Sequence, residues 1–165
     1  MKKSNYSSIE KIISIAKRGG MFILVDDEKR ENEGDLIIST SDSNAKNINF
    51  MAKYGRGLIC LAMDSLQAKK LNLSLMSPIN KSRNKTAFTI SIEAKKGITT
   101  GISAFDRAKT IKVAIKKNSK RRDIVSPGHI FPIIAKTGRP IGNALITSRW
   151  IMKINISTAT LRVPF

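Results

Sequence analysis

Residues 86–111 read TAFTISIEAKKGITTGISAFDRAKTI, and they join a strand pattern to a helix pattern through a short turn. The segment 87–94 alternates between apolar and polar residues, which predicts a strand. Phe88, Ile90 and Ile92 lie on one face of this strand. The segment 97–103 is a Gly/Thr turn, and 106–118 has the apolar spacing of an amphipathic helix. A strand followed by such a helix predicts a domain in which helices pack on a sheet.

The same patterns continue on both sides of this segment. Strands are expected at 21–25, 35–39, 57–63 and 129–135. Helices are expected at 7–20, 42–55 and 65–71, and 72–86 is expected to be a long polar loop. Pro132 suggests an edge or a bend in the strand at 129–135. Strands and helices interleave without a strict repeat, so the fold class is α/β or α+β, a single domain with a mixed sheet.

The composition describes a strongly basic chain. Its 165 residues fit one domain, and 41% apolar residues are enough for a buried core. Thirty Lys and Arg against twelve Asp and Glu give a net charge of +18, which raises the hypothesis of nucleic-acid binding. The lysines are scattered, with their densest cluster at 116–122, and aromatics are 5%, too few for an obvious base-stacking platform. A generally basic solvated surface is therefore favoured, and nucleic-acid binding stays open as an alternative.

Targeting signals are not evident in the sequence. No apolar run approaches the roughly 18 to 20 residues needed to span a bilayer, so no membrane association is expected. The N-terminal residues contain no continuous apolar block, so no secretory signal is expected. The single cysteine, Cys60, lies in an apolar strand pattern and is interpreted as a core residue. A lone cysteine fits a reducing compartment, and the cytoplasm is the expected location.

Half of the acidic residues gather in one short stretch. Six of the twelve lie between Asp26 and Asp35. Glu31, Glu33 and Asp35 are spaced by two, so in an extended chain their carboxylates point the same way and repel each other unless a cation joins them. Mg²⁺ prefers such oxygen ligands, and Arg30 offers a fork suited to a phosphate or a carboxylate. The alternative interpretation, an exposed charged hairpin, stays open on this pattern alone.

Two further features are candidates for chemistry. His129 is the only histidine, and the preceding Ser-Pro-Gly delivers it to the start of a strand. It is either a partly buried histidine satisfied by the backbone or a general acid/base, since its unperturbed pKa lies near neutrality. The segment 95–110 has backbone N–H groups and hydroxyls near a helix start that could hold an anion, although it has no Walker or dinucleotide fingerprint.

Four motifs occur together in one order and spacing: DDEKRENEGDL, GRGLICLAM, TAFTISIEAKKGITTGISAFDRAKTI and SPGHIFPIIA. In this respect the chain resembles the 3,4-dihydroxy-2-butanone-4-phosphate synthases of riboflavin biosynthesis, over about residues 9–137. The resemblance implies an α/β sandwich with a mixed sheet. It also implies a homodimeric lyase that converts ribulose 5-phosphate to 3,4-dihydroxy-2-butanone 4-phosphate and formate. The family needs Mg²⁺ or Mn²⁺ and no organic cofactor.

The resemblance also implies roles for individual residues. Glu31 matches the metal-binding glutamate of the family, and Arg30, Glu31 and Asp35 match positions that contact the substrate. His129 matches the catalytic histidine of the Pro-Gly-His motif. These roles are expectations that come from the motifs and not from the spacing of the residues.

The resemblance ends near residue 137. Residues 1–137 are expected to form an incomplete synthase-like domain, and 138–165 an atypical tail. The family continues into a Gly-His-Thr-Glu segment with a second metal-binding histidine, followed by a catalytic glutamate, but this chain has no acid after Asp123 and no second histidine. We therefore expect weakened metal binding and little synthase activity. The alternatives are a non-catalytic family member that pairs with an intact copy, and a basic nucleic-acid-binding protein.

Overall fold

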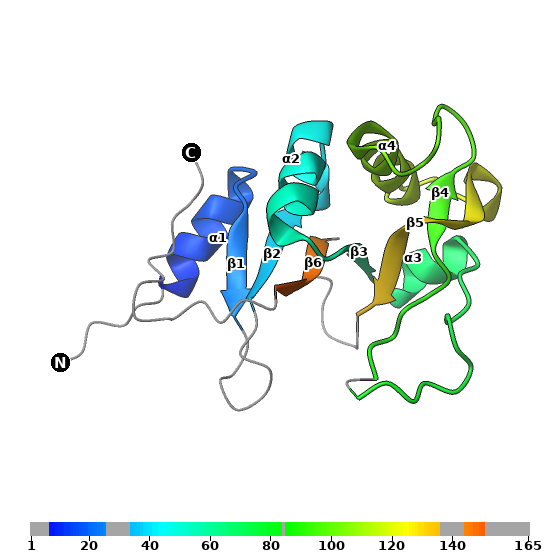
Figure 1. Cartoon of the computed structure of the whole chain (residues 1–165), viewed down its shortest axis with the longest axis horizontal. Coiled ribbons are helices and arrows are strands. Elements are labelled where there is room, and N and C mark those ends of the chain that lie inside the picture. The colour runs from blue at the N-terminus through cyan, green and yellow to red at the C-terminus, as the bar shows by residue number, and fades with distance from the viewer. Residues whose placement is uncertain (1–6, 26–33, 84, 136–143, 151–165) are drawn as a thin grey trace.

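A computed structural model describes residues 7–25, 34–83, 85–135 and 144–150 of the chain. Six strands of the described residues form one sheet in the order β1-β2-β6-β3-β5-β4 (Figure 1). They are β1 (Phe22–Val25), β2 (Gly34–Ser39), β3 (Leu58–Met63), β4 (Ile92–Ala94), β5 (Ile124–Ile134) and β6 (Ala144–Trp150). Strands β3 and β5 run parallel, whereas the other neighbours are antiparallel. The predicted mixed sheet is confirmed.

The helices begin where the sequence offers a capping side chain. They are α1 (Ile9–Lys17), α2 (Ala45–Phe50), α3 (Ser65–Lys70) and α4 (Ala104–Ala114). A π-helical turn (Met51–Gly55) follows α2, and 3₁₀ turns lie at Thr40–Asp42 and Arg121–Asp123. Each α-helix has a capping oxygen that accepts a backbone N–H of its first turn, from Ser8, Asn44, Asp64 and Ser103. None of the helices in the described ranges is long and apolar enough to cross a membrane.

The core lies between one face of the sheet and helices α2 and α4. Alternate strand residues point to that face and are almost fully buried: Ile38, Ile59, Leu61, Met63 and Ile130. They belong to one cluster with Ile48 of α2 and with Ala108 and Ile111 of α4. Both helices lie on the same side of the sheet in Figure 1. Each buried Ile or Leu contributes about 1.5–3 kcal/mol, so this face anchors the fold.

The strand predicted at 87–94 is shorter than expected. Only Ile92–Ala94 forms a regular strand, and the residues before it make isolated bridges, Leu75 to Thr89 and Phe88 to Ile133. The buried residues of the segment are Thr89, Ile92 and Ala94, whereas Phe88 and Ile90 are partly exposed. This segment divides its backbone hydrogen bonds between two neighbours. The Ile90 N–H donates to Ser74 O and the Thr89 N–H to Pro132 O.

Strand β5 is longer than predicted and is not at an edge. It begins at Ile124 instead of residue 129, and it lies between β3 and β4. Pro132 pairs in register with Leu61 of β3, and its carbonyl accepts the Thr89 N–H at 3.0 Å. The edge position suggested by Pro132 was therefore wrong. A proline has no N–H to donate, and here its carbonyl supplies the hydrogen bond.

Strand β6 comes from the segment predicted to be an atypical tail. Its backbone pairs with β2 on one side and with β3 on the other, both antiparallel. Residues 144–150 are therefore an inner strand of the sheet.

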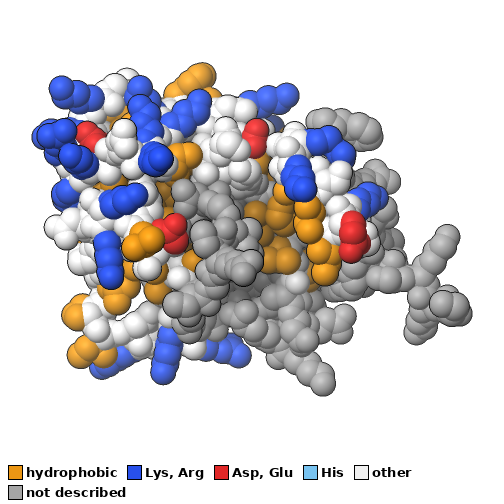
Figure 2. Space-filling model, turned by 180° about the vertical axis from the view of Figure 1, so that it is seen from behind, with side chains coloured by type: hydrophobic (Ala, Val, Ile, Leu, Met, Phe, Trp, Pro, Cys, Tyr) orange, Lys and Arg blue, Asp and Glu red, His pale blue; other side chains and the backbone are white. Residues whose placement is uncertain are grey.

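The basic side chains spread over the surface. Figure 2 shows Lys and Arg side chains scattered over the face seen from behind, with few acidic side chains between them. This spread fits the expectation of a generally basic surface. One concentration of these charges is described below.

Candidate active site

A bulge in β5 presents the Ser-Pro-Gly-His segment. Ile92 of β4 lies opposite Ile130, whereas the next residue, Glu93, lies opposite Val125. Residues 126–129 of β5 therefore have no partner residue in β4. Such bulges re-aim side chains and often border functional sites.

Gly128 allows this bulge to lie against β4. A Cβ at this position would be 2.2 Å from the carbonyl carbon of Ile92 and 2.5 Å from the Glu93 nitrogen. Both neighbours are backbone atoms, which cannot move aside as a side-chain end could. The Gly128 N–H donates to the Ser91 hydroxyl at 3.0 Å, which pins the bulge. The close approach thus requires glycine and brings the next residue, His129, beside Glu93.

His129 and Glu93 form a hydrogen-bonded pair of side chains. The His129 Nδ1 contacts the Glu93 Oε1, and the two side chains are 43% and 14% exposed. An ionised carboxylate only accepts hydrogen bonds, so the Nδ1–H donates and the neutral ring keeps its lone pair on Nε2. The exposed imidazole is therefore oriented as a proton acceptor. This arrangement favours the acid/base interpretation of His129 over a histidine satisfied by the backbone.

The loop after β4 holds Glu93 from the other side. Gly101 has a φ of +83°, and a Cβ there would be 1.8 Å from the Glu93 Oε1. The Gly101 N–H and the Thr99 hydroxyl donate to Asp106 Oδ2 at 3.0 and 2.8 Å, and the Thr99 N–H donates to Oδ1 at 3.1 Å. Asp106, in the first turn of α4, thereby ties this loop against Glu93.

The hydrogen bonds to Asp106 also change its titration. The Thr99 hydroxyl is the largest cause that lowers the pKa of Asp106, the backbone N–H groups add to it, and burial opposes them. The Thr99 and Gly101 N–H groups were candidates for holding an external anion. They already bind an internal one, the Asp106 carboxylate, so that interpretation was wrong for these two groups.

The register of the sheet places Asp35 at the same level as His129. Ile37 of β2, Ile146 of β6, Cys60 of β3 and Phe131 of β5 lie in one row across the sheet. Asp35 precedes the first of these residues by two positions, and His129 precedes the last by two. The regular positions of this row, such as Cys60, point to the face opposite α2 and α4. Asp35 and His129 lie at one level of the sheet, each at an irregularity of its strand, which is a register shift between Gly34 and Leu36 in β2 and the bulge at 126–129 in β5.

This part of the face is partly open. Leu58 of β3, two residues before Cys60, is 48% exposed at the same level. Three strand spacings of about 4.8 Å separate β2 from β5, so Asp35 and His129 lie roughly 14 Å apart across the sheet. They are close enough to face one ligand but too far apart to touch. Cys60 is fully buried, as its apolar strand pattern predicts.

The remaining predicted site residues lie outside the described part of the chain. Arg30 and Glu31, and also Glu33, fall in 26–33. Within the described residues, no group of three or more His, Cys, Asp or Glu side chains could hold a metal ion. The structure therefore brings His129 and Asp35 to one level of the sheet and leaves Arg30 and Glu31 as predictions.

Glu93 is the site residue that the sequence analysis missed. It is the only acid between Asp64 and Asp106, in a stretch whose other charged residues are all basic. That isolation was a usable signal. Its partner His129 lies 36 positions away, so local patterns could not reveal the pair.

Comparison with known proteins identifies the fold and its relatives. A family model for 3,4-dihydroxy-2-butanone 4-phosphate synthase matches residues 10–140. The chain belongs to this family. A 3,4-dihydroxy-2-butanone 4-phosphate synthase from Pseudomonas aeruginosa is 49% identical over 138 residues, which are 84% of this chain and 38% of that protein. The riboflavin biosynthesis protein RibBA of Aquifex aeolicus is 48% identical over 135 residues, 81% of this chain and 33% of that protein.

Solved synthase structures have the same fold. A 3,4-dihydroxy-2-butanone 4-phosphate synthase in complex with two magnesium ions gives a TM-score of 0.81 at 30% identity, covering 86% of this chain and 75% of that one. The two-domain synthase RibBX from A. baumannii gives a TM-score of 0.78 at 38% identity, covering 86% of this chain and 47% of that one. The chain thus spans less than two fifths of the length of the curated relatives named above. The expected synthase-like α/β fold is confirmed.

Proposed function

We propose that this chain is a lyase of riboflavin biosynthesis that converts ribulose 5-phosphate to 3,4-dihydroxy-2-butanone 4-phosphate and formate. The observation that carries the proposal is the His129–Glu93 pair, set on a sheet with the fold of the synthase family. The reaction begins with removal of a proton from a sugar carbon, and that step needs a positioned base. The pair supplies one on an exposed face.

His129 would act as the base through Nε2. Glu93 holds the Nδ1–H, which fixes the tautomer and stabilises the imidazolium that forms when the ring accepts a proton. Asp35 would bind a hydroxyl of the substrate from across the sheet, and Arg30, outside the described residues, would bind its phosphate. A substrate lying over the exposed Leu58 would reach both sides of this arrangement.

A divalent cation fits the donors of this segment. Asp35 follows the acid-rich segment 26–33 and lies at the level of His129 in the sheet, and carboxylate oxygens with water are the ligands that Mg²⁺ prefers. Glu31 would hold the ion, Mg²⁺ or Mn²⁺, and no organic cofactor is required. When bound, the ion polarises the sugar oxygens and stabilises the negative charge that develops on them.

The rate of this chain is expected to be low. The family has a second metal-binding histidine and a catalytic glutamate beyond the region of resemblance, whereas this chain has one histidine and no acid after Asp123. The loss of one proton-transfer group typically costs ~10²–10⁴-fold in rate. We further propose a homodimer in the cytoplasm, as the resemblance to the family implies.

The proposal can be tested by incubating the chain with ribulose 5-phosphate and MgCl₂. Formate dehydrogenase then measures the formate that is released. The purified chain should release formate above the level of a His129→Gln variant, and far more slowly than the Pseudomonas aeruginosa synthase. Equal rates for the chain and that relative would contradict the expected impairment. Equal rates for the chain and His129→Gln would overturn the synthase proposal.

A second candidate is a non-catalytic subunit that pairs with an intact synthase. The single histidine in the chain favours it, because the family needs two. Mixing the chain with an intact synthase and separating the assemblies by native mass spectrometry would test this. A mixed dimer without formate release by the chain alone would support the second candidate.

A further inference from the structure

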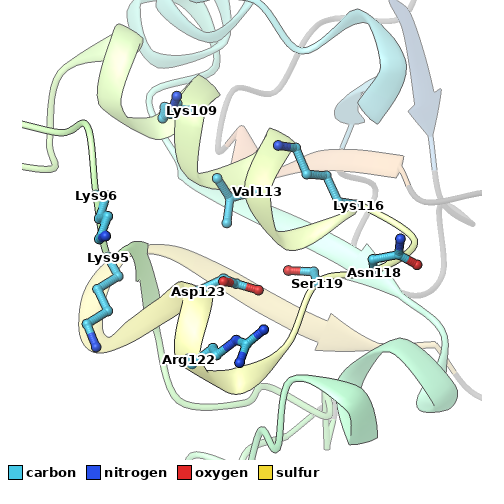
Figure 3. Close-up of a pocket in the computed structure, with 9 residues that line it drawn as sticks. All are labelled: Lys95, Lys96, Lys109, Val113, Lys116, Asn118, Ser119, Arg122 and Asp123. Carbon is cyan, nitrogen blue, oxygen red and sulfur yellow. The ribbon is translucent and has the colours of Figure 1, made fainter.

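A basic groove lies beside the C-terminal half of α4. Its volume is about 600 Å³. The residues that line it come from the segment after β4, from α4 and the loop that follows it, and from the turn Arg121–Asp123 (Figure 3). These residues are Lys95, Lys96, Lys109, Val113, Lys116, Asn118, Ser119, Arg122 and Asp123. The cluster at 116–122 noted in the sequence therefore meets three further lysines in the folded chain.

The cations of the basic groove are not neutralised by neighbouring acids. Among the described residues, no ion pair joins any of its four lysines or Arg122 to a carboxylate. Asp123 is the one acid in the lining, and its Oδ2 already accepts the Lys120 N–H at 2.8 Å. Five positive charges around one concave surface repel each other and attract an anion.

Ser119 adds an unused polar group inside the groove. The residue is 5% exposed, and its buried hydroxyl has no hydrogen-bond partner among the described residues. Figure 3 shows this hydroxyl pointing into the space between α4 and the turn at Arg121–Asp123. Buried hydroxyls almost always have a partner, because leaving one unpaired costs free energy. A bound ligand oxygen would supply that partner.

We propose that the basic groove binds the polyphosphate group of a small molecule. A chain of linked phosphates concentrates several negative charges in a small volume, which matches five cations around one cavity. The Arg122 guanidinium can bind phosphate oxygens with two parallel N–H groups, and the lysines act as point charges. The Ser119 hydroxyl donates to a further phosphate oxygen.

The lining favours phosphate over a nucleobase or an extended nucleic acid. Val113 is the one apolar residue of the lining, and the lining contains no aromatic ring on which a base could stack. The groove is also separate from the candidate active site. None of His129, Glu93, Thr99 and Asp106 lines it. The proposed site is therefore independent of the proposed lyase activity.

The proposal can be tested by calorimetric titration of the whole chain with inorganic tripolyphosphate. At about 0.15 M NaCl, diffuse attraction to the charged surface is screened. A triple variant, Lys96→Gln, Lys109→Gln and Lys116→Gln, should bind at least about tenfold more weakly. The matched control Lys11→Gln, Lys46→Gln and Lys81→Gln removes the same charge from exposed positions outside the groove, and its affinity should change less than about twofold. Ser119→Ala, at unchanged charge, should weaken binding about threefold.

Four results would overturn the proposal. The first is equal weakening in the two triple variants, which would indicate attraction to the overall charge. The second is an unchanged affinity in Ser119→Ala. The third is displacement of tripolyphosphate by ribulose 5-phosphate at similar concentration, which would make the groove part of a sugar-phosphate site. Single-stranded RNA that binds the wild type and the groove variant equally, without tripolyphosphate binding, would favour a diffuse nucleic-acid surface instead.

Discussion

The contact between Glu93 and His129 depends on charge as well as shape. Glu93→Gln keeps the length of the side chain but replaces the carboxylate, so the ring loses its ionised acceptor. We expect formate release to fall by about 10²-fold, within the usual range for general-base catalysis. His129→Gln should fall at least as far, and the double variant should be no worse than His129→Gln alone.

The tautomer of His129 gives a readout that does not depend on activity. His129 is the only histidine, so its imidazole nitrogens give one unambiguous set of ¹⁵N signals. The wild type should carry its proton on Nδ1 at high pH, and Glu93→Gln should shift the proton toward Nε2. An exposed acid elsewhere, Glu10→Gln, serves as the control. The same tautomer in all three proteins would show that Glu93 does not orient the ring.

Substitution of Gly128 tests how closely the bulge in β5 packs on β4. In Gly128→Ala the new Cβ would meet the Ile92 carbonyl carbon at 2.2 Å, so one of the two backbones must shift. We expect a loss of about 1–3 kcal/mol in the free energy of unfolding, measured with urea. At Gly34 the nearest atom is the end of a side chain, Ile23 Cγ2 at 3.1 Å, so Gly34→Ala should cost less. Equal losses would contradict the close approach.

Sequence patterns predicted the position of a residue best where that position depends on neighbours in the sequence. The helix expected at 7–20 begins after Ser8, whose hydroxyl accepts the Lys11 N–H, and Cys60 is buried as its apolar strand pattern predicts. The strand expected at 87–94 is regular only from Ile92, because the backbone before it forms hydrogen bonds with both Ser74 and Pro132. Glu93 was missed because its role depends on a residue 36 positions away.

At the scale of an element, the loop 97–103 should be sensitive to acid. The hydrogen bonds to Asp106 lower its pKa in the folded chain. They therefore stabilise the fold at pH values above 3.8, which is the ordinary pKa of this carboxyl group. That contribution is lost as the pH falls through the lower folded value. The melting temperature of Asp106→Asn should therefore lie below that of the wild type at pH 7, and the difference should shrink as the pH falls below about 4.

A cap in another helix separates charge from geometry. The Asn44 side-chain oxygen accepts the Asn47 N–H at 2.9 Å at the start of α2, and an amide does not titrate. Asn44→Ala should lower the melting temperature by an amount that stays nearly constant with pH. A constant difference for Asp106→Asn as well would show that the Asp106 charge does not stabilise the loop.

At the scale of the whole molecule, β6 joins two parts of the sheet. Strands β1 and β2 lie on one side of it, and β3, β5 and β4 lie on the other. Ile146 has Ile37 of β2 and Cys60 of β3 as its partners, so the backbone there is flanked on both sides. A proline at an inner position removes a donor from this ladder and is rarely tolerated.

The position of β6 predicts unequal effects of proline in two strands. Ile146→Pro should abolish the cooperative unfolding transition or lower its midpoint sharply. Leu24→Pro, in the edge strand β1 that pairs only with β2 among the described strands, should be tolerated better. Circular dichroism during urea unfolding measures both. Greater damage from Leu24→Pro would contradict an inner position for β6.

The fold class was predictable because apolar periods of two and 3.6 distinguish strands from helices along most of the chain. The order of the strands was not, because it depends on pairings between distant segments. The expected tail at 138–165 illustrates this difference, since 144–150 matched no motif and yet forms an inner strand. Backbone hydrogen bonds in a sheet do not require a particular side-chain motif.

The central place of β6 also affects the chain during its synthesis. A ribosome makes both outer parts of the sheet before it makes residues 144–150. Until then β2 and β3 each have one strand edge without its final neighbour, and such edges pair readily with other chains. The nascent protein therefore completes its sheet late, through contacts between distant segments that form slowly. Chaperone dependence and co-translational aggregation should respond most strongly to changes in this strand.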